Sequence, residues 1–105
     1  MAKYKTASTL DFIEWLESLV LKHRIQVKDR IKRIEDDGHF GSYKDLKNGI
    51  YELKWEIGTR AYYVYVDPQE LLFLWGGNKN GQDKDIKKAK NILEKFLASH
   101  GAEES

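Results

Sequence analysis

The chain contains no cysteine among its 105 residues and only one proline. The absence of cysteine excludes disulfide bonds and thiolate metal sites, so a reducing cytoplasm is the simplest location. No apolar run approaches the ~20 residues that a membrane-spanning helix needs. The segment Met1 to Lys5 also lacks the apolar stretch of a secretory signal. We therefore expect a cytoplasmic protein without a membrane partner.

A large excess of charge of one sign is also missing. Eighteen Lys and Arg residues stand against seventeen Asp and Glu residues, which gives a formal net charge of +1. The overall charge therefore does not indicate nucleic-acid binding, and any basic site must be local. The length is that of one domain. We predict a single domain over residues 1–98, followed by a flexible tail over residues 99–105.

The sequence has few signs of metal, cofactor or nucleophile chemistry. His23, His39 and His100 are too scattered to form a typical set of metal ligands. The serines lie in no nucleophile-elbow motif. The glycine-rich loop over residues 76–81 fits neither a Walker A motif nor a dinucleotide fingerprint. We therefore expect neither a metal ion nor a cofactor.

The N-terminal part of the chain indicates two amphipathic helices after a short edge strand at residues 3–6. Ser8 or Thr9 can cap the first helix, which should continue to about residue 21. Gly38 is a reasonable end for the second helix. The apolar residues that recur at helical spacing are Phe12, Trp15, Leu16, Leu19, Val20, Val27, Ile31 and Ile34.

From Tyr43 onward the period changes to that of strands. Apolar and charged residues alternate over residues 51–57, which predicts one buried face and one solvated face that carries Glu52, Lys54 and Glu56. Strands are also expected at residues 60–66 and 71–75, and the second of these is apolar throughout and should be central. With a helix at residues 83–98, the pattern predicts an α+β fold, namely an antiparallel sheet of three to four strands with two N-terminal helices packed on it and a C-terminal helix.

Three cations near the glycine-rich loop are candidates for function. Lys54 can be explained as part of a cross-strand charge ladder, and Lys79 as part of a simple strand-to-helix turn. Arg60 shares a strand face with Tyr62, which together could offer charge to a phosphate and a ring to a base. The tyrosines of this strand could equally belong to the core.

Three sequence elements resemble the RelE/HigB-type toxins of bacterial type II toxin-antitoxin modules. The resemblance is strongest to the HigB-like group, also known as phage-derived addiction-module killer proteins, and it covers roughly residues 8–95. The matching elements are Gly41-x-x-Lys44-x-Leu46-x-x-Gly49-Ile50-x-Glu52-Leu53-Lys54, then Arg60-x-x-Tyr63, then Leu74-x-Gly76-Gly77-x-Lys79-x-x-Gln82-x-x-Asp85-Ile86-x-x-Ala89. The N-terminal half agrees as well, in Phe12-x-x-Trp15-Leu16-x-x-Leu19 and Arg30-Ile31-x-Arg33-Ile34.

This resemblance implies a RelE-like fold and a metal-independent mRNA endoribonuclease that acts on translating ribosomes. Lys54 would be a base or charge stabiliser, Arg60 the phosphate clamp, and Lys79 a second clamp or proton donor. The other implied site residues are Tyr62 and Lys84, which would bind RNA, and Gly76, Gly77, Gln82 and Asp85, which would support the loop and the helix start.

The resemblance also implies partners: a helix-turn-helix antitoxin, the ribosome with its mRNA, and operator DNA only through the antitoxin. Two alternatives stay open. Several relatives carry a C-terminal aromatic or histidine for acid/base catalysis, and no such residue occurs near Lys84 to Lys88. This is what a non-enzymatic, ParE-like DNA gyrase inhibitor would show. An attenuated toxin that acts mainly in a DNA-bound complex with its antitoxin is the other alternative.

Overall fold

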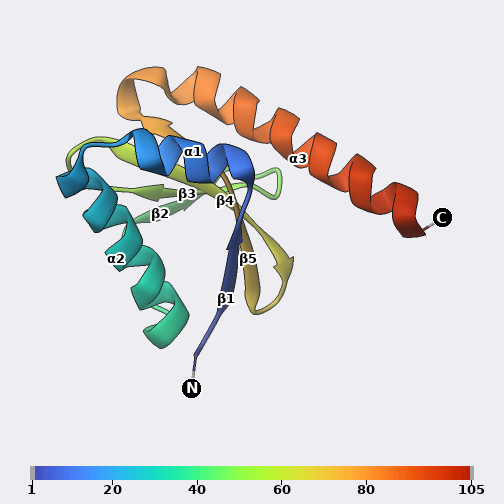
Figure 1. The fold of residues 1–105 in the computed structure, drawn as a ribbon, viewed down its shortest axis with the longest axis horizontal. Coiled ribbons are helices and arrows are strands. Elements are labelled where there is room, and N and C mark those ends of the chain that lie inside the picture. Colours follow the sequence, from blue (N-terminus) through green and yellow to red (C-terminus); the bar gives the residue numbers. More distant parts are fainter. Residues whose placement is uncertain (1, 105) are drawn as a thin grey trace.

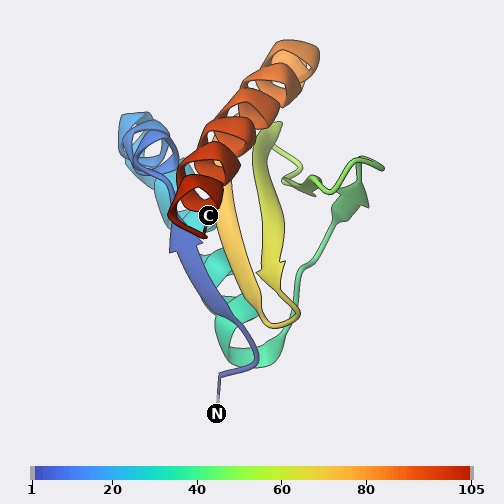
Figure 2. The ribbon, with the colours of Figure 1, turned by 90° about the vertical axis from the view of Figure 1, so that its right-hand side faces the viewer.

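Five strands form one mixed sheet between two helical layers (Figures 1 and 2). The computed structural model describes residues 2–104, with side-chain surroundings for residues 2–99. The sheet order is β1-β5-β4-β3-β2. The elements are β1 (Lys5–Ser8), α1 (Leu10–Ser18), α2 (Leu21–Asp37), β2 (Tyr43–Asp45), β3 (Tyr51–Lys54), β4 (Thr59–Asp67), β5 (Glu70–Asn78), the 3-10 turn η1 (Lys79–Gly81) and α3 (Gln82–Glu104).

The α+β class and the presence of the three helices are confirmed, although α1 ends at Ser18 rather than near residue 21, and the predicted strand count is wrong. The sheet has five strands rather than three or four, and it is not purely antiparallel because β1 pairs in parallel with β5. In this register Lys5 faces Glu70. Because these partners are remote in sequence, no local pattern could reveal their pairing. The apolar strand β5 lies between β1 and β4, as its composition predicts.

The ends of the N-terminal helices follow from local capping. The Thr9 hydroxyl accepts a hydrogen bond from the Phe12 amide at 3.0 Å and caps α1. Gly38 ends α2 in the left-handed conformation, with φ of 71°. Helix α3 continues to Glu104, beyond the expected end near residue 98. The flexible tail over residues 99–105 lies mostly outside the residues whose side chains the structure describes, and it stays a prediction.

The two faces of the sheet carry separate apolar cores. Helices α1 and α2 contribute Phe12, Val27 and Ile34 to the first core, which lies on one face of the sheet. Helix α3 contributes Ala89 and Ile92 to the second core. The strand residues in the first core include Leu53, Ala61, Tyr63, Leu71 and Phe73, and those in the second include Ile50, Tyr62, Val64, Leu72 and Leu74.

A bulge in β5 adjusts this alternation close to the glycine pair. Tyr62 pairs with Trp75 and Tyr63 with Phe73, so Leu74 is left between the two pairs. Both Leu74 and Trp75 consequently pack in the core beneath α3. The bulge sets the direction in which the following residues of β5 face, including the glycine pair that precedes η1.

Candidate functional site

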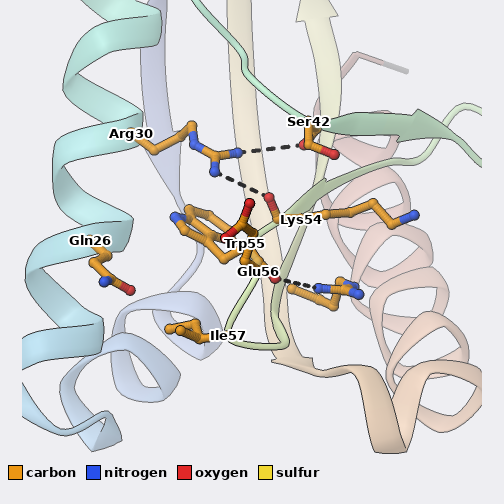
Figure 3. Close-up of a pocket in the computed structure, with 8 residues that line it drawn as sticks. Gln26, Arg30, Ser42, Lys54, Trp55, Glu56 and Ile57 are labelled. Atoms are coloured by element: carbon orange, nitrogen blue, oxygen red, sulfur yellow. Dashed lines mark hydrogen bonds between the residues drawn. The ribbon is translucent and has the colours of Figure 1, made fainter.

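Lys54 and Arg60 are paired residues on neighbouring strands. Their Cα atoms are partners in the antiparallel register of β3 and β4, which places the two side chains on the same face of the sheet. Both residues are partly exposed. They line a cavity of about 630 Å³, together with Arg30, Trp55 and Glu56 among others (Figure 3). We refer to it as the β3–β4 cavity. The structure therefore brings two of the three predicted catalytic cations together.

The Arg60 guanidinium is held against the turn between β3 and β4. Its Nη1 donates hydrogen bonds to the backbone oxygens of Trp55 at 3.1 Å and Thr59 at 2.9 Å. Its Nε is buried and has no hydrogen-bond partner among the described residues. A buried donor without a partner costs about 1–3 kcal/mol. The backbone hydrogen bonds fix the orientation of the guanidinium, which suits Arg60 to bind a phosphate at the cavity.

Arg30 forms the opposite wall of the cavity and has a structural role. It donates hydrogen bonds to the backbone oxygens of Phe40 at 3.2 Å and Lys54 at 3.1 Å. Its guanidinium also lies over the Trp55 ring, 4.3 Å from the centroid. Figure 3 shows Arg30 directed from α2 toward Ser42 and the Lys54 backbone, whereas the Lys54 side chain points away from it. Arg30 thus anchors the end of β3 and leaves the Lys54 ammonium accessible.

Burial adjusts the electrostatics of this wall. Burial lowers the pKa of the Arg30 guanidinium from its ordinary value, and the nearby charge of Arg33 lowers that pKa further. Since the hydrogen bonds of Arg30 go to backbone oxygens, Arg30 adds positive potential without an acidic partner in those bonds. The cavity is therefore electropositive on two sides, although the whole chain is almost neutral.

Lys79 lies on the adjacent loop and is not among the described residues that line the β3–β4 cavity. Its amide donates to the Gly58 carbonyl at 2.8 Å, and its aliphatic chain lies beside Gly58, whose φ is 102°. Lys79 lines one hollow with Lys84 at the start of α3, and another with His23. The structure thus places Lys79 next to the turn that precedes Arg60. The roles predicted for Lys79 and Lys84 stay predictions.

Tyr62 is not placed to stack on a base, so this prediction is wrong for the described conformation. The residue is fully buried beneath α3, where it is the register partner of Glu52. Burial, and then the nearby Glu52 carboxylate, raise the pKa of the Tyr62 phenol above its usual range. Tyr62 belongs to the core, which was the alternative that the sequence left open.

The alternation predicted for residues 51–57 is also wrong at two positions. Glu52 is fully buried, whereas Ile57 is 46% exposed. Strand β3 ends at Lys54, so Ile57 lies in a turn, and α3 covers the face that carries Glu52. Gln82 at the start of α3 donates from Nε2 to the Glu52 carboxylate at 2.8 Å. The buried charge is thereby given a polar partner.

Gly76 and Gly77 allow helices to approach β5 closely on its two faces. A Cβ atom at Gly76 would lie 2.3 Å from the Trp15 ring of α1. One at Gly77 would lie 1.9 Å from a carboxylate oxygen of Asp85 in α3. The other carboxylate oxygen of Asp85 accepts a hydrogen bond from Trp75 Nε1 at 3.1 Å. These contacts position the start of α3 and the Lys79 loop beside β4.

Sequence reasoning missed Arg30 and Glu56 as parts of the cavity. Arg30 lies in the element Arg30-Ile31-x-Arg33-Ile34, which agrees with the family pattern but indicates no role in a site, and alternation predicts that Glu56 lies on the solvated strand face. For a metal ion, no group of three or more His, Cys, Asp or Glu side chains with suitable proximity occurs in the described part of the chain. No helix in that part is long and apolar enough to cross a membrane.

No family model matches this sequence. A protein of Haemophilus influenzae, described only as uncharacterized, is 39% identical over 93 residues, which cover 85% of this chain and 92% of that protein. This chain belongs to the same family as that protein. Because the relative's description names no activity, membership by itself assigns no function.

Solved structures identify the fold. The structure of the RelE toxin of E. coli, a mutant in the free state, has a TM-score of 0.63 and 17% identity, with coverage of 84% of this chain and 98% of that chain. The protein has a RelE-like fold. The RelBE2 toxin-antitoxin complex of Mycobacterium tuberculosis gives a TM-score of 0.59 at 14% identity, covering 72% of this chain and 98% of that chain. The intact RelBE complex of E. coli gives a TM-score of 0.60 at 17% identity, covering 71% of this chain and 95% of that chain.

Proposed function

We propose that this RelE-like protein is the toxin of a type II toxin-antitoxin module. In this proposal it is a metal-independent endoribonuclease that cuts mRNA on translating ribosomes in the cytoplasm. The observation that carries it is the paired placement of Lys54 and Arg60 in an open cavity. The RelE-like fold supports the toxin role, and the sequence motifs around Lys54, Arg60 and Lys79 support the chemistry.

The proposed chemistry uses the RNA's own 2′-hydroxyl as the nucleophile. Attack on the adjacent phosphate builds negative charge on the non-bridging oxygens, which fixed cations stabilise most effectively at a partly dry site. Arg60 can bind these oxygens through the N–H groups that its backbone hydrogen bonds leave free. Lys54, opposite it, adds a second positive charge. Lys79, which lies on the neighbouring loop, is proposed to bind the RNA strand.

The proposed partners follow the same reasoning. The comparison structures include toxins crystallised with their antitoxins. For this chain we propose a helix-turn-helix antitoxin as the inhibiting partner, with operator DNA contacted only through that antitoxin. An antitoxin could act by covering the β3–β4 cavity or by preventing docking on the ribosome.

Cleavage of mRNA on purified ribosomes tests the proposal directly. The purified protein is incubated with ribosomes programmed with a defined mRNA, and new RNA ends are mapped by primer extension. Wild type should cut, Arg60→Ala should lose about 100-fold or more in rate, and Lys79→Ala should lose less. Lys95→Ala, which removes an exposed lysine of α3, is the matched control and should cut normally. An intact mRNA with wild type, or equal cutting by Arg60→Ala, contradicts the proposal.

A DNA gyrase assay addresses the alternative of a non-enzymatic inhibitor. If the protein acts as proposed, purified gyrase should supercoil DNA normally in its presence. Loss of supercoiling while mRNA stays intact would instead favour the ParE-like alternative. Absence of growth arrest on induced expression would favour an attenuated toxin that acts through its antitoxin complex.

A further inference from the structure

The β3–β4 cavity contains one carboxylate that the motif-based assignment leaves without a role. Among the described residues that line this cavity, Glu56 alone carries an acidic side chain, and it is exposed. The other charged side chains that line the same cavity are Arg30 of α2, Lys54 of β3 and Arg60 of β4. A single carboxylate among three cations is thus present where a phosphate ester is expected to bind.

The backbone places Glu56 next to the phosphate-binding group. Arg60 Nη1 donates to the carbonyl oxygen of Trp55, the residue immediately before Glu56. Two backbone hydrogen bonds fix this turn. The Trp55 amide donates to the Thr59 carbonyl at 3.1 Å, and the Gly58 amide donates to the Trp55 carbonyl at 3.0 Å. Figure 3 shows Glu56 beside Trp55, and Glu56 and Lys54 both line the cavity. The backbone of Glu56 therefore belongs to the same short turn that binds the Arg60 guanidinium.

Cleavage of RNA through the 2′-hydroxyl needs a group that removes a proton. A guanidinium does not deprotonate in proteins, and an ammonium group must lose its own proton before it can act as a base. A carboxylate is by contrast already in its basic form at neutral pH. The cations of the cavity are consequently suited to charge stabilisation, and the base role fits the carboxylate better.

We propose that Glu56 is the general base of the RNA cleavage, and this inference rests on the proposed function. The Glu56 carboxylate takes the proton of the 2′-hydroxyl while the 2′-oxygen forms a bond to phosphorus. The bond between phosphorus and the 5′-oxygen breaks, and that oxygen takes a proton from water. The hydroxide so formed takes the proton back from Glu56. The products are a 2′,3′-cyclic phosphate and a 5′-hydroxyl end, with Lys54 and Arg60 bound to the non-bridging oxygens.

Substitution of Glu56 by glutamine tests this role, because it keeps the shape and removes the basic oxygen. Cleavage of mRNA on programmed ribosomes is measured under single-turnover conditions across a pH series. Affinity is measured separately with an mRNA that carries a 2′-O-methyl group at the cut position and cannot be cleaved. Glu56→Gln should cut about 100-fold or more slowly, bind the uncleavable mRNA complex as wild type does, and lose the rise of rate with pH on the acidic side.

A matched control and the contrary outcomes make the test decisive. Glu94→Gln removes the same charge from an exposed position on α3, and it should retain the wild-type rate and pH profile. Near wild-type cutting by Glu56→Gln, or a slower rate with the acidic rise retained, overturns the base assignment while leaving the proposed function intact. If the wild type itself cuts no mRNA, the proposed function fails before Glu56 is tested.

Discussion

Lys54 and Arg60 face each other across β3 and β4, whereas Lys79 stands on the loop beyond β5, next to Gly58. The three cations that the motifs group together are thus divided into a pair and a neighbour. This division determines how their contributions to activity should combine, because residues that contact one phosphate are coupled and residues that contact separate groups are not.

The first prediction concerns this coupling. Lys54→Ala and Arg60→Ala should each reduce the cleavage rate, and the double variant should lose less than the product of the two single losses. Lys79→Ala combined with Arg60→Ala should instead be close to multiplicative, since Lys79 lines a different hollow. Single-turnover rates of the five variants and wild type provide both comparisons. Equal coupling in the two pairs would contradict the division.

The second prediction concerns the close approach of α3 to β5. Gly77→Ala should destabilise the fold by about 1–3 kcal/mol, because the new methyl group overlaps the Asp85 carboxylate. Adding Asp85→Ala to Gly77→Ala removes the overlap and should restore part of that loss, although Asp85→Ala alone destabilises by removing the acceptor of Trp75 Nε1. Urea unfolding measures all three variants. A strictly additive double variant would show that the overlap is relieved in another way.

The third prediction concerns the buried carboxylate of Glu52. Gln82→Ala should destabilise the fold by about 1–3 kcal/mol, since it leaves that carboxylate without its Gln82 donor. Glu52→Gln keeps a polar group of the same shape and removes the buried charge, so its free energy of unfolding should be equal to or higher than that of wild type. Thermal and urea unfolding check both. A large loss for Glu52→Gln would mean that the charge itself is required.

The fourth prediction concerns alkaline pH. Burial raises the pKa of the phenols of Tyr62 and Tyr63 above their usual value, so the folded state holds these protons more tightly than the unfolded state does. The resulting stability is complete below about pH 10, the ordinary pKa of tyrosine, and is lost as pH rises through the folded values. Each such phenol should lower the free energy of unfolding by about 1.4 kcal/mol per pH unit in this window.

Urea unfolding at a series of pH values from neutral to strongly alkaline measures that slope. Tyr62→Phe removes one of the two groups and should make the decline shallower than in wild type. An unchanged slope in Tyr62→Phe would contradict the assignment of a tightly held proton to this residue.

The sequence predicts the parts of the fold that local physics decides. The Thr9 cap, the end of α2 at Gly38 and the apolar central strand β5 all follow from short-range rules, and each is confirmed. The pairing of β1 with β5 does not follow from such rules, because nothing in the sequence near either strand indicates its partner. The motif match indicated Lys54 and Arg60, and the structure brings them together.

The errors at Glu52 and Tyr62 have a common cause in α3. Alternation predicts that Glu52 is solvated and that Tyr62 can stack on a base. Helix α3 packs on the face that carries both residues and buries them. A period of two states only which residues share a face. Whether that face is solvated depends on the packing of an element thirty residues away, such as the Gln82 contact with Glu52.

The parallel pairing of β1 with β5 also bears on how the chain folds during synthesis. Residues that meet across these strands, such as Thr6 and Leu71, are separated by 65 positions. Closing so long a loop slows folding, and the first strand to leave the ribosome must wait for the last. The sheet that presents Lys54 and Arg60 is therefore completed only when synthesis of β5 is finished. A nascent chain that ends before β5 therefore lacks the framework that holds these two cations on one face.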